Sequence, residues 1–138
     1  MKNLFIDTNI VIDLLEKREP YCYDAVSLFT MSYNKQVKLF ISPMTYSTAS
    51  FLLRKHGADG VRNLHSNLRQ LANVSSADES TVDQALISQF EDFEDALQYY
   101  SAIQSDAEVI ITRNSRDFAK SKIPVMTAGE YLALQLHR

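Results

Sequence analysis

Short apolar segments that end in helix-capping residues are the feature that most constrains this chain. Each is a candidate buried strand and leads into apolar residues at helical spacing. Strands are expected at Lys2–Ile6, Val37–Ile41, Val74-Ser75, Val109–Thr112 and Ile123–Met126. Because strands and helices alternate along the chain, the pattern predicts an α/β fold with a mostly parallel sheet.

Helix-start signals mark the segments between these strands. Ser42-Pro43 places a capping residue before a proline that suits the first helical position. Ser76 and Glu79 have the spacing of a capping box, in which each side chain binds the other's backbone amide. A further helix is expected over Phe93–Ser105, with Phe93 on its buried face.

Length and composition favour one ordinary globular domain over residues 1–138. The chain has 138 residues, of which 46% are hydrophobic, and it has a single cysteine. One cysteine excludes a disulfide framework and a Cys-rich zinc site. Its first apolar stretch is broken at Asp7, so we expect no signal peptide, and no run approaches the roughly 18 apolar residues of a membrane span. The expected setting is the cytoplasm, without a membrane partner.

The net charge limits how the chain binds nucleic acid. It is -3 at neutral pH, whereas proteins that bind duplexes through their whole surface show a basic excess. An acidic pocket that holds a divalent metal, with a few basic residues beside it, remains compatible with this charge.

Acidic residues gather where strands end or helices begin. Asp7 follows the first strand, Asp92 and Asp95 share one helix face, and Asp117 lies in the turn after the Val109–Thr112 strand. Each has an ordinary alternative, because Asp caps helices, acids favour helix N-termini, and Asp forms turns. Functional groups of a parallel sheet gather beyond the carboxyl ends of its strands. Carboxylates without a His or Cys cluster favour a hard metal over zinc.

Other reactive side chains show no catalytic spacing. Cys22 is interpreted as a structural thiol, and His56, His65 and His137 lie too far apart to share a ligand pattern, so we expect them to be solvated. The pair Tyr99-Tyr100 either packs in the core or stacks on bases.

Three segments in this order resemble the PIN-domain family, and in particular the VapC-type toxins of bacterial toxin–antitoxin pairs. They are Phe5-Ile6-Asp7-Thr8-Asn9-Ile10, Asp92-Phe93-Glu94-Asp95-Ala96 and Ile111-Thr112-Arg113-Asn114-Ser115-Arg116-Asp117-Phe118. The resemblance implies a PIN-like three-layer α/β/α fold with a central, mostly parallel sheet. It also implies a Mg²⁺- or Mn²⁺-dependent endoribonuclease that hydrolyses RNA phosphodiester bonds, pairs with a cognate antitoxin and forms a homodimer.

The family's site residues map onto this chain one by one. Catalytic roles fall on Asp7, Asp95 and Asp117. The implied metal ligands are Asp7, Asp92, Asp95, Asn114 and Asp117. The supporting residues are Thr8, Asn9, Thr48 and Thr112. Residues near this edge that would contact RNA are Arg113, Arg116 and Lys120, with Arg54, Lys55 and Arg62 as a second basic group, and an ordinary solvated surface role is the alternative for each.

One departure from the family pattern keeps a second interpretation open. The family usually places a glutamate in the third helix, and Thr48 occupies that position here. A hydroxyl supplies no charge to a metal, so the alternative is a catalytically weakened PIN-like module that binds RNA or a protein. A phosphoacceptor receiver domain is a third interpretation, ranked lower because Asp7 has no adjacent acid.

Overall fold

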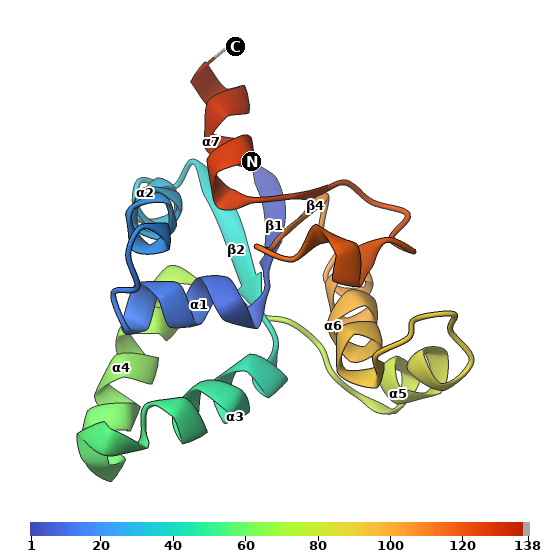
Figure 1. Ribbon diagram of the computed structural model, residues 1–138, viewed down its shortest axis with the longest axis horizontal. Coiled ribbons are helices and arrows are strands. Elements are labelled where there is room, and N and C mark those ends of the chain that lie inside the picture. The colour runs from blue at the N-terminus through green and yellow to red at the C-terminus, as the bar shows by residue number, and fades with distance from the viewer. Residues whose placement is uncertain (137–138) are drawn as a thin grey trace.

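The computed structural model describes residues 1–136, and it has the three-layer α/β/α fold that the sequence predicts (Figure 1). A parallel five-stranded sheet has the order β3-β2-β1-β4-β5. Its strands are β1 (Lys2–Ile6), β2 (Val37–Ile41), β3 (Asn73–Val74), β4 (Val109–Ile111) and β5 (Val125–Met126). The helices are α1 (Thr8–Leu15), α2 (Tyr21–Tyr33), α3 (Pro43–Leu52), α4 (Gly57–Leu71), α5 (Glu79–Leu86), α6 (Phe93–Gln104) and α7 (Ala128–Leu136), with short 3-10 turns at Arg54–His56 and Ser115–Phe118.

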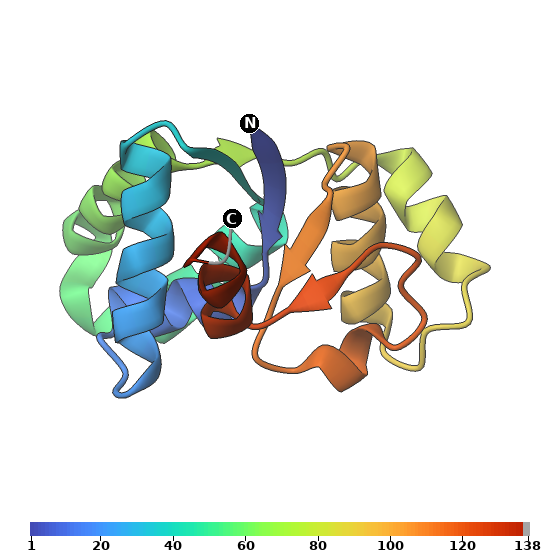
Figure 2. The same ribbon diagram turned by 90° about the horizontal axis from the view of Figure 1, so that it is seen from above.

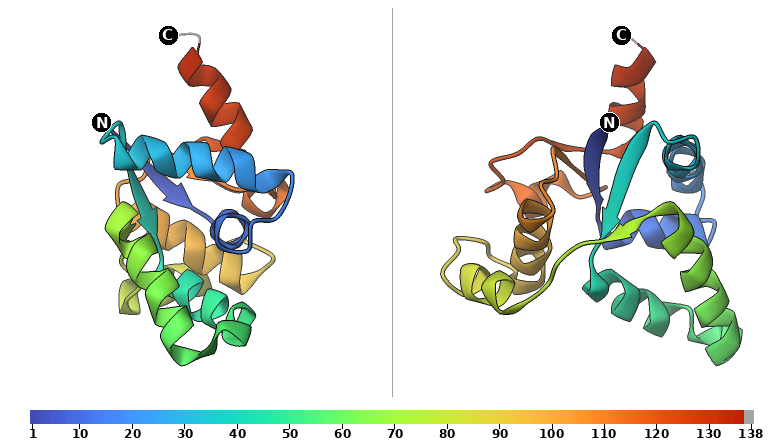
Figure 3. Two further views of the ribbon diagram at one scale, coloured as in Figure 1. Left: turned by 90° about the vertical axis from the view of Figure 1, so that its left-hand side faces the viewer. Right: turned by 180° about the vertical axis from the view of Figure 1, so that it is seen from behind.

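Alternating side chains of the strands bury both faces of the sheet. Leu4 and Ile6 of β1 pack in a cluster with residues of α1, α2, α4 and α7, whereas Phe5 between them packs with Tyr99 and Ala102 of α6. Figure 2 shows the sheet between these two groups of helices, with α5 outside α6. Figure 3 shows α7 extending away from the rest of the domain. A strand that is covered by helices on both faces is a continuous apolar run, as Leu4–Ile6 of β1 is.

The strand order determines where a site can form. Chain connections run outward from β1 in one direction to β2 and β3, and in the other direction to β4 and β5. The carboxyl ends of β1 and β4 are neighbours, because Ile6 pairs with Ile111 in parallel register. An open α/β sheet forms its ligand crevice where the strand order reverses, outside the carboxyl ends. Here that crevice lies at Asp7 and the turn after Ile111.

Several local expectations hold and others are wrong. Ser42 caps α3 by accepting a hydrogen bond from the Thr45 amide, as expected. The capping box before α5 is formed by Asp78 and Thr81, not by Ser76 and Glu79, because the Asp78 side chain accepts from the Thr81 amide at 3.2 Å. Phe93 is 46% exposed, because the face of α6 that is buried against the sheet carries Tyr99 and Ala102 instead.

A buried ion pair fastens α1 to the turn after β4. Asp13 has no solvent exposure, and the Arg113 guanidinium donates from Nε to its Oδ2 at 2.7 Å and from Nη2 to its Oδ1 at 3.2 Å. The same guanidinium lies 4.1 Å from the centre of the Tyr21 ring. The sequence suggested Arg113 as an RNA contact, but the structure uses its guanidinium to neutralise a buried carboxylate.

His65 also departs from the solvated state expected of it. Its Nε2 lies 2.8 Å from the Ser50 hydroxyl, and its ring packs edge-on against Tyr46. Burial is the main reason that the pKa of His65 is lowered. His137 lies outside the described residues. Within residues 1–136, no helix combines the length and apolar character needed to cross a membrane.

Replacing Arg113 with Met should destabilise the fold. The change leaves the Asp13 carboxylate buried without a partner, so the free energy of unfolding should fall by about 3 kcal/mol. Urea denaturation measures this, with Arg116→Met as a matched control at an exposed arginine nearby. A loss below about 1 kcal/mol in Arg113→Met would place the pair in the class of weak surface ion pairs.

Stability should fall on acidification through His65. Its pKa is lowered in the fold, so below the ordinary value of 6.5 the unfolded chain binds the proton more readily. The free energy of unfolding therefore decreases as the pH drops from that value toward the folded pKa. His65→Gln should flatten this part of the profile, whereas His56→Gln, at an exposed histidine, should leave it unchanged. Parallel profiles for the wild type and His65→Gln would refute the assignment.

Candidate active site

Three elements bring the predicted acids together. Asp7 directly follows β1, Asp92 and Asp95 lie at the start of α6, and Asp117 lies in the 3-10 turn after β4. A cavity of about 180 Å³ opens at this edge. The residues that line it are Phe90, Glu91, Asp92, Asp95, Arg116, Asp117, Ala119 and Lys120. Arg116 and Lys120 therefore lie beside the acids, as the sequence suggested.

Asp7 lies at the end of β1 with 8% of its surface exposed. Its Oδ1 accepts from the Thr8 amide at 2.8 Å, which makes it the N-cap of α1, and its Oδ2 accepts from the Thr112 hydroxyl at 2.8 Å. Burial raises the pKa of Asp7, and these hydrogen bonds oppose that rise. Asp7 therefore caps α1 and also lies at the candidate site.

Gln98 joins three elements beneath the site. It is 2% exposed, and its Nε2 lies within hydrogen-bond reach of Asp7 Oδ1 at 3.3 Å and of the Thr8 and Thr45 hydroxyls, both at 3.1 Å. Its Oε1 accepts from the Ser42 hydroxyl. The amide thus connects α6 to the end of β1 and to the start of α3.

Sequence reasoning missed Gln98, although a signal was present. It stands three residues after Asp95, which stands three residues after Asp92, so all three share one side of α6. A polar residue continuing the acidic face toward the core is typical of a side chain that supports a site. The missed Asp13 has a similar signal, since it is a lone acid among apolar residues of α1.

Asp95 carries the strongest electrostatic perturbation that this edge shows. Its pKa is raised to about 7, first by burial and then by the negative charges of Asp117, Asp92, Asp7 and Glu94. No ion pair within residues 1–136 involves any of these acids. Because like charges at one place oppose ionisation, a cation between them would relieve the repulsion.

The donor chemistry fits a hydrated hard cation. Carboxylate oxygens are the ligands of Mg²⁺ and Mn²⁺, and Mg²⁺ typically keeps several waters while one or two carboxylates hold it. Within residues 1–136, no group of three or more His, Cys, Asp or Glu side chains is close enough to form a metal cage. Asp95 and Asp117, with Asp7 buried behind them, fit the hydrated mode and not a closed cage.

The turn after β4 is held by the polar residues that the sequence named as supporting. The Asn9 side chain donates to the Thr112 hydroxyl at 3.3 Å and accepts from the Arg113 amide at 3.3 Å. The Thr112 hydroxyl also accepts from the Asn114 amide at 3.1 Å. Thr112 therefore positions both Asp7 and the turn that carries Asp117.

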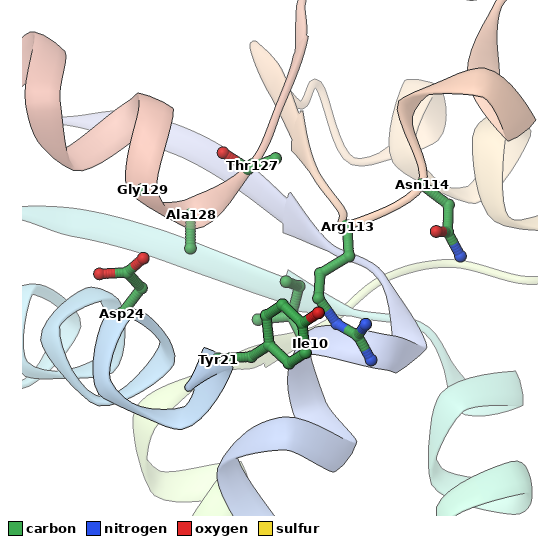
Figure 4. Close-up of a pocket in the computed structure, with 8 residues that line it drawn as sticks. All are labelled: Ile10, Tyr21, Asp24, Arg113, Asn114, Thr127, Ala128 and Gly129. Atoms are coloured by element: carbon green, nitrogen blue, oxygen red, sulfur yellow. The ribbon is translucent and has the colours of Figure 1, made fainter. Parts of the chain in front are cut away.

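Two residues named by the sequence line a cavity other than the acidic one. Arg113 and Asn114 line a different cavity of about 410 Å³, between the start of α2 and the start of α7. Figure 4 shows the Arg113 guanidinium beside the Tyr21 ring, with Asn114 well separated from both. Thr48 is half-buried on α3, one turn after Thr45, and supplies no carboxylate.

Comparison with known proteins gives a family match. The family model of the PIN domain matches residues 3–116. Curated proteins yield no match to this chain. A solved toxin–antitoxin complex from Klebsiella pneumoniae has a TM-score of 0.69 and 24% identity, covering 91% of this chain and 97% of that chain.

Two further solved structures share the fold. VapBC2 from Rickettsia felis, bound to a DNA fragment from its promoter, has a TM-score of 0.63 and 14% identity, covering 90% of this chain and 96% of that chain. VapC20 from Mycobacterium tuberculosis, a toxin that cleaves the sarcin–ricin loop, has a TM-score of 0.60 and 16% identity over 78% of this chain and 86% of that chain. The matched span covers most of the chain, and the chain therefore belongs to the PIN-domain family.

Proposed function

We propose that this protein is a VapC-like endoribonuclease toxin that depends on Mg²⁺ or Mn²⁺. The observation that carries the proposal is the set of mutually repelling carboxylates at the strand-order reversal of a PIN fold. Asp95 and Asp117 face a small cavity there, and Asp7 lies behind them. A toxin that cleaves RNA is among the solved structures of similar fold, which supports an RNA substrate.

Each site residue has a defined part in this chemistry. Asp95 and Asp117 would hold the metal, with Asp92 at the rim and Asp7 behind, and Asp7 is fixed by Thr112 and Gln98. A bound divalent ion supplies charge neutralisation at the cleaved phosphate and lowers the pKa of an attacking water.

Basic side chains would complete substrate binding. Arg116 and Lys120 line the same cavity as the acids and would bind the flanking phosphates of the RNA. Arg113 is left out of this set because Asp13 occupies its guanidinium.

The proposed partners rest on the similarity of this fold to solved toxin–antitoxin structures. The solved relatives from Klebsiella pneumoniae and Rickettsia felis are toxin–antitoxin assemblies, which supports a cognate antitoxin for this chain. A homodimer and a cytoplasmic setting belong to the same proposal, as the ordinary state of VapC-type toxins.

A catalytically weakened binding module is the second candidate, and Thr48 favours it. The residue lies one turn after Thr45, whose hydroxyl is 3.1 Å from Gln98 Nε2, so its place in α3 is close to the polar network. A threonine there leaves the metal with fewer charged ligands. The two candidates share one fold and differ in whether RNA is cleaved.

Metal binding should depend on the acidic edge. Mg²⁺ or Mn²⁺ titration by calorimetry should show binding by the wild type that weakens about tenfold or more in Asp95→Asn and in Gln98→Met, since the first removes a ligand and the second a partner of Asp7. Asp83→Asn, at an exposed acid of α5, is the matched control. Equal affinities in Asp95→Asn and Asp83→Asn would contradict the assigned site.

Restoring the family glutamate should strengthen the site. Thr48→Glu should raise the rate of single-stranded RNA cleavage at limiting Mg²⁺ by about tenfold, because a further carboxylate tightens metal binding. Ser47→Glu, at the exposed neighbouring position, should leave the rate unchanged. Cleavage by Thr48→Glu alone, with an inactive wild type, would favour the binding-module candidate. Cleavage by neither protein would reject the nuclease proposal.

A further inference from the structure

A larger groove adjoins the acidic cavity. Its volume is about 500 Å³, within the range of ligand-binding clefts. Phe90 and Lys120 line both the groove and the acidic cavity, so the two are adjacent. The remaining lining residues of the groove are Ile87, Ser88, Gln89, Tyr99, Tyr100, Ile103 and Lys122. Figure 2 shows the segments that carry them, the α5–α6 loop, α6 and the chain after β4, gathered at one side of the domain.

Aromatic rings form one wall of this groove. The Phe90 ring lies 5.0 Å from the Tyr99 ring and 6.4 Å from the Tyr100 ring, measured between centroids. Ile87 extends the apolar wall and is 83% exposed. The Lys122 amide donates to the Tyr99 hydroxyl at 3.0 Å, which fixes the opposite wall against α6. The rings are therefore held in place by the fold.

The charge of the groove is opposite to that of its neighbour. Its lining residues include two lysines, Lys120 and Lys122, and none of them is acidic. Both lysines are exposed. In a chain with a net charge of -3, a groove with this composition is complementary to an anionic ligand that also offers flat apolar surfaces. Single-stranded nucleic acid has both properties, since proteins bind it with basic grooves and aromatic side chains.

We propose that this groove, bounded by Phe90, Tyr100, Lys120 and Lys122, binds the nucleotides of single-stranded RNA next to the phosphate that lies in the acidic cavity. Bases pack against the rings, and Lys120 and Lys122 contact the backbone phosphates. The proposal rests on the proposed function for the identity of the ligand as RNA. It assigns to the protein a substrate subsite beyond the carboxylates, and it gives an acidic protein a local binding surface for a polyanion.

Binding without cleavage isolates the subsite. The probe is a fluorescently labelled oligoribonucleotide of about eight nucleotides, and anisotropy is measured in EDTA. Tyr100→Leu and Lys122→Ala should each weaken binding at least about fivefold. Lys122→Ala should also reduce the slope of log affinity against log salt by about 0.7, the value for one lost phosphate contact on a single strand.

Matched variants lie away from the groove. Tyr33→Leu replaces a tyrosine that is 74% exposed on α2, and Lys35→Ala removes an exposed lysine at the opposite end of the sheet. Both should bind the oligoribonucleotide as the wild type does. Thermal unfolding of all four variants identifies any loss that comes from misfolding. Tyr100→Phe keeps the ring and should retain binding even where Tyr100→Leu is less stable.

The outcomes separate this proposal from the nuclease proposal. RNA binding that depends on the groove, in a protein that does not cleave RNA with Mg²⁺ or Mn²⁺, supports the subsite and rejects the nuclease. RNA cleavage with the same KM in the wild type, Tyr100→Leu and Lys122→Ala overturns the subsite and keeps the nuclease. Unchanged RNA affinity in the groove variants likewise overturns the subsite.

Discussion

The architecture of the site depends on hydrogen bonds that compensate the burial of one carboxylate. Asp7 lies at the junction of β1 and α1, where burial raises its pKa and opposes its charge. Hydrogen bonds from three different elements compensate: the Thr8 amide in α1, the Thr112 hydroxyl after β4 and the Gln98 amide in α6. Because each donor comes from a separate part of the chain, a correctly assembled sheet and helix layer are needed before this carboxylate can be buried. Fold and site are therefore coupled through a single residue.

The turn after β4 lies between acidic side chains in two different electrostatic environments. On one side, Arg113 neutralises the buried Asp13 with two hydrogen bonds, and the result is a structural contact between α1 and the turn. On the other side, Asp95 has like charges around it, and its pKa rises to about 7. Carboxylates left in repulsion at a strand-order reversal are typical of a ligand or catalytic site, whereas a paired one is typical of structural support. The contrast distinguishes the proposed site acids from an acid that stabilises the fold.

The hydrogen-bond network around Asp7 includes residues at the start of α3, the helix in which Thr48 replaces the family's glutamate. Ser42 and Thr45 at the start of α3 contact Gln98, so this helix is already connected to the site through hydroxyl and amide groups. A threonine on the next turn adds no charge to that network. The site thus depends on the acids of β1, α6 and the turn after β4. Next to it lies the groove with aromatic residues and lysines that we propose as an RNA subsite, and binding there would not require a metal.

Periodicity and capping residues were enough to predict much of this protein. The apolar runs of β1, β2 and β4 and the cap at Ser42 are local signals, because a strand or helix start is decided by adjacent residues. The ordered acidic segments around Asp7, Asp95 and Asp117 likewise indicated the PIN fold before any contact was known.

Other features required the tertiary structure. The Gln98 network, the pairing of Arg113 with Asp13 and the exposure of Phe93 each depend on which element lies opposite a side chain. Residues 53 to 100 positions apart meet in the hydrogen bonds of Gln98 and Arg113, and no local pattern specifies such a partner. The sequence by itself determined the elements and the acidic residues that they carry. The packing of α6 and the β4 turn against β1 decided which of those residues share a site, because charge repulsion and burial arise only when the chain is assembled.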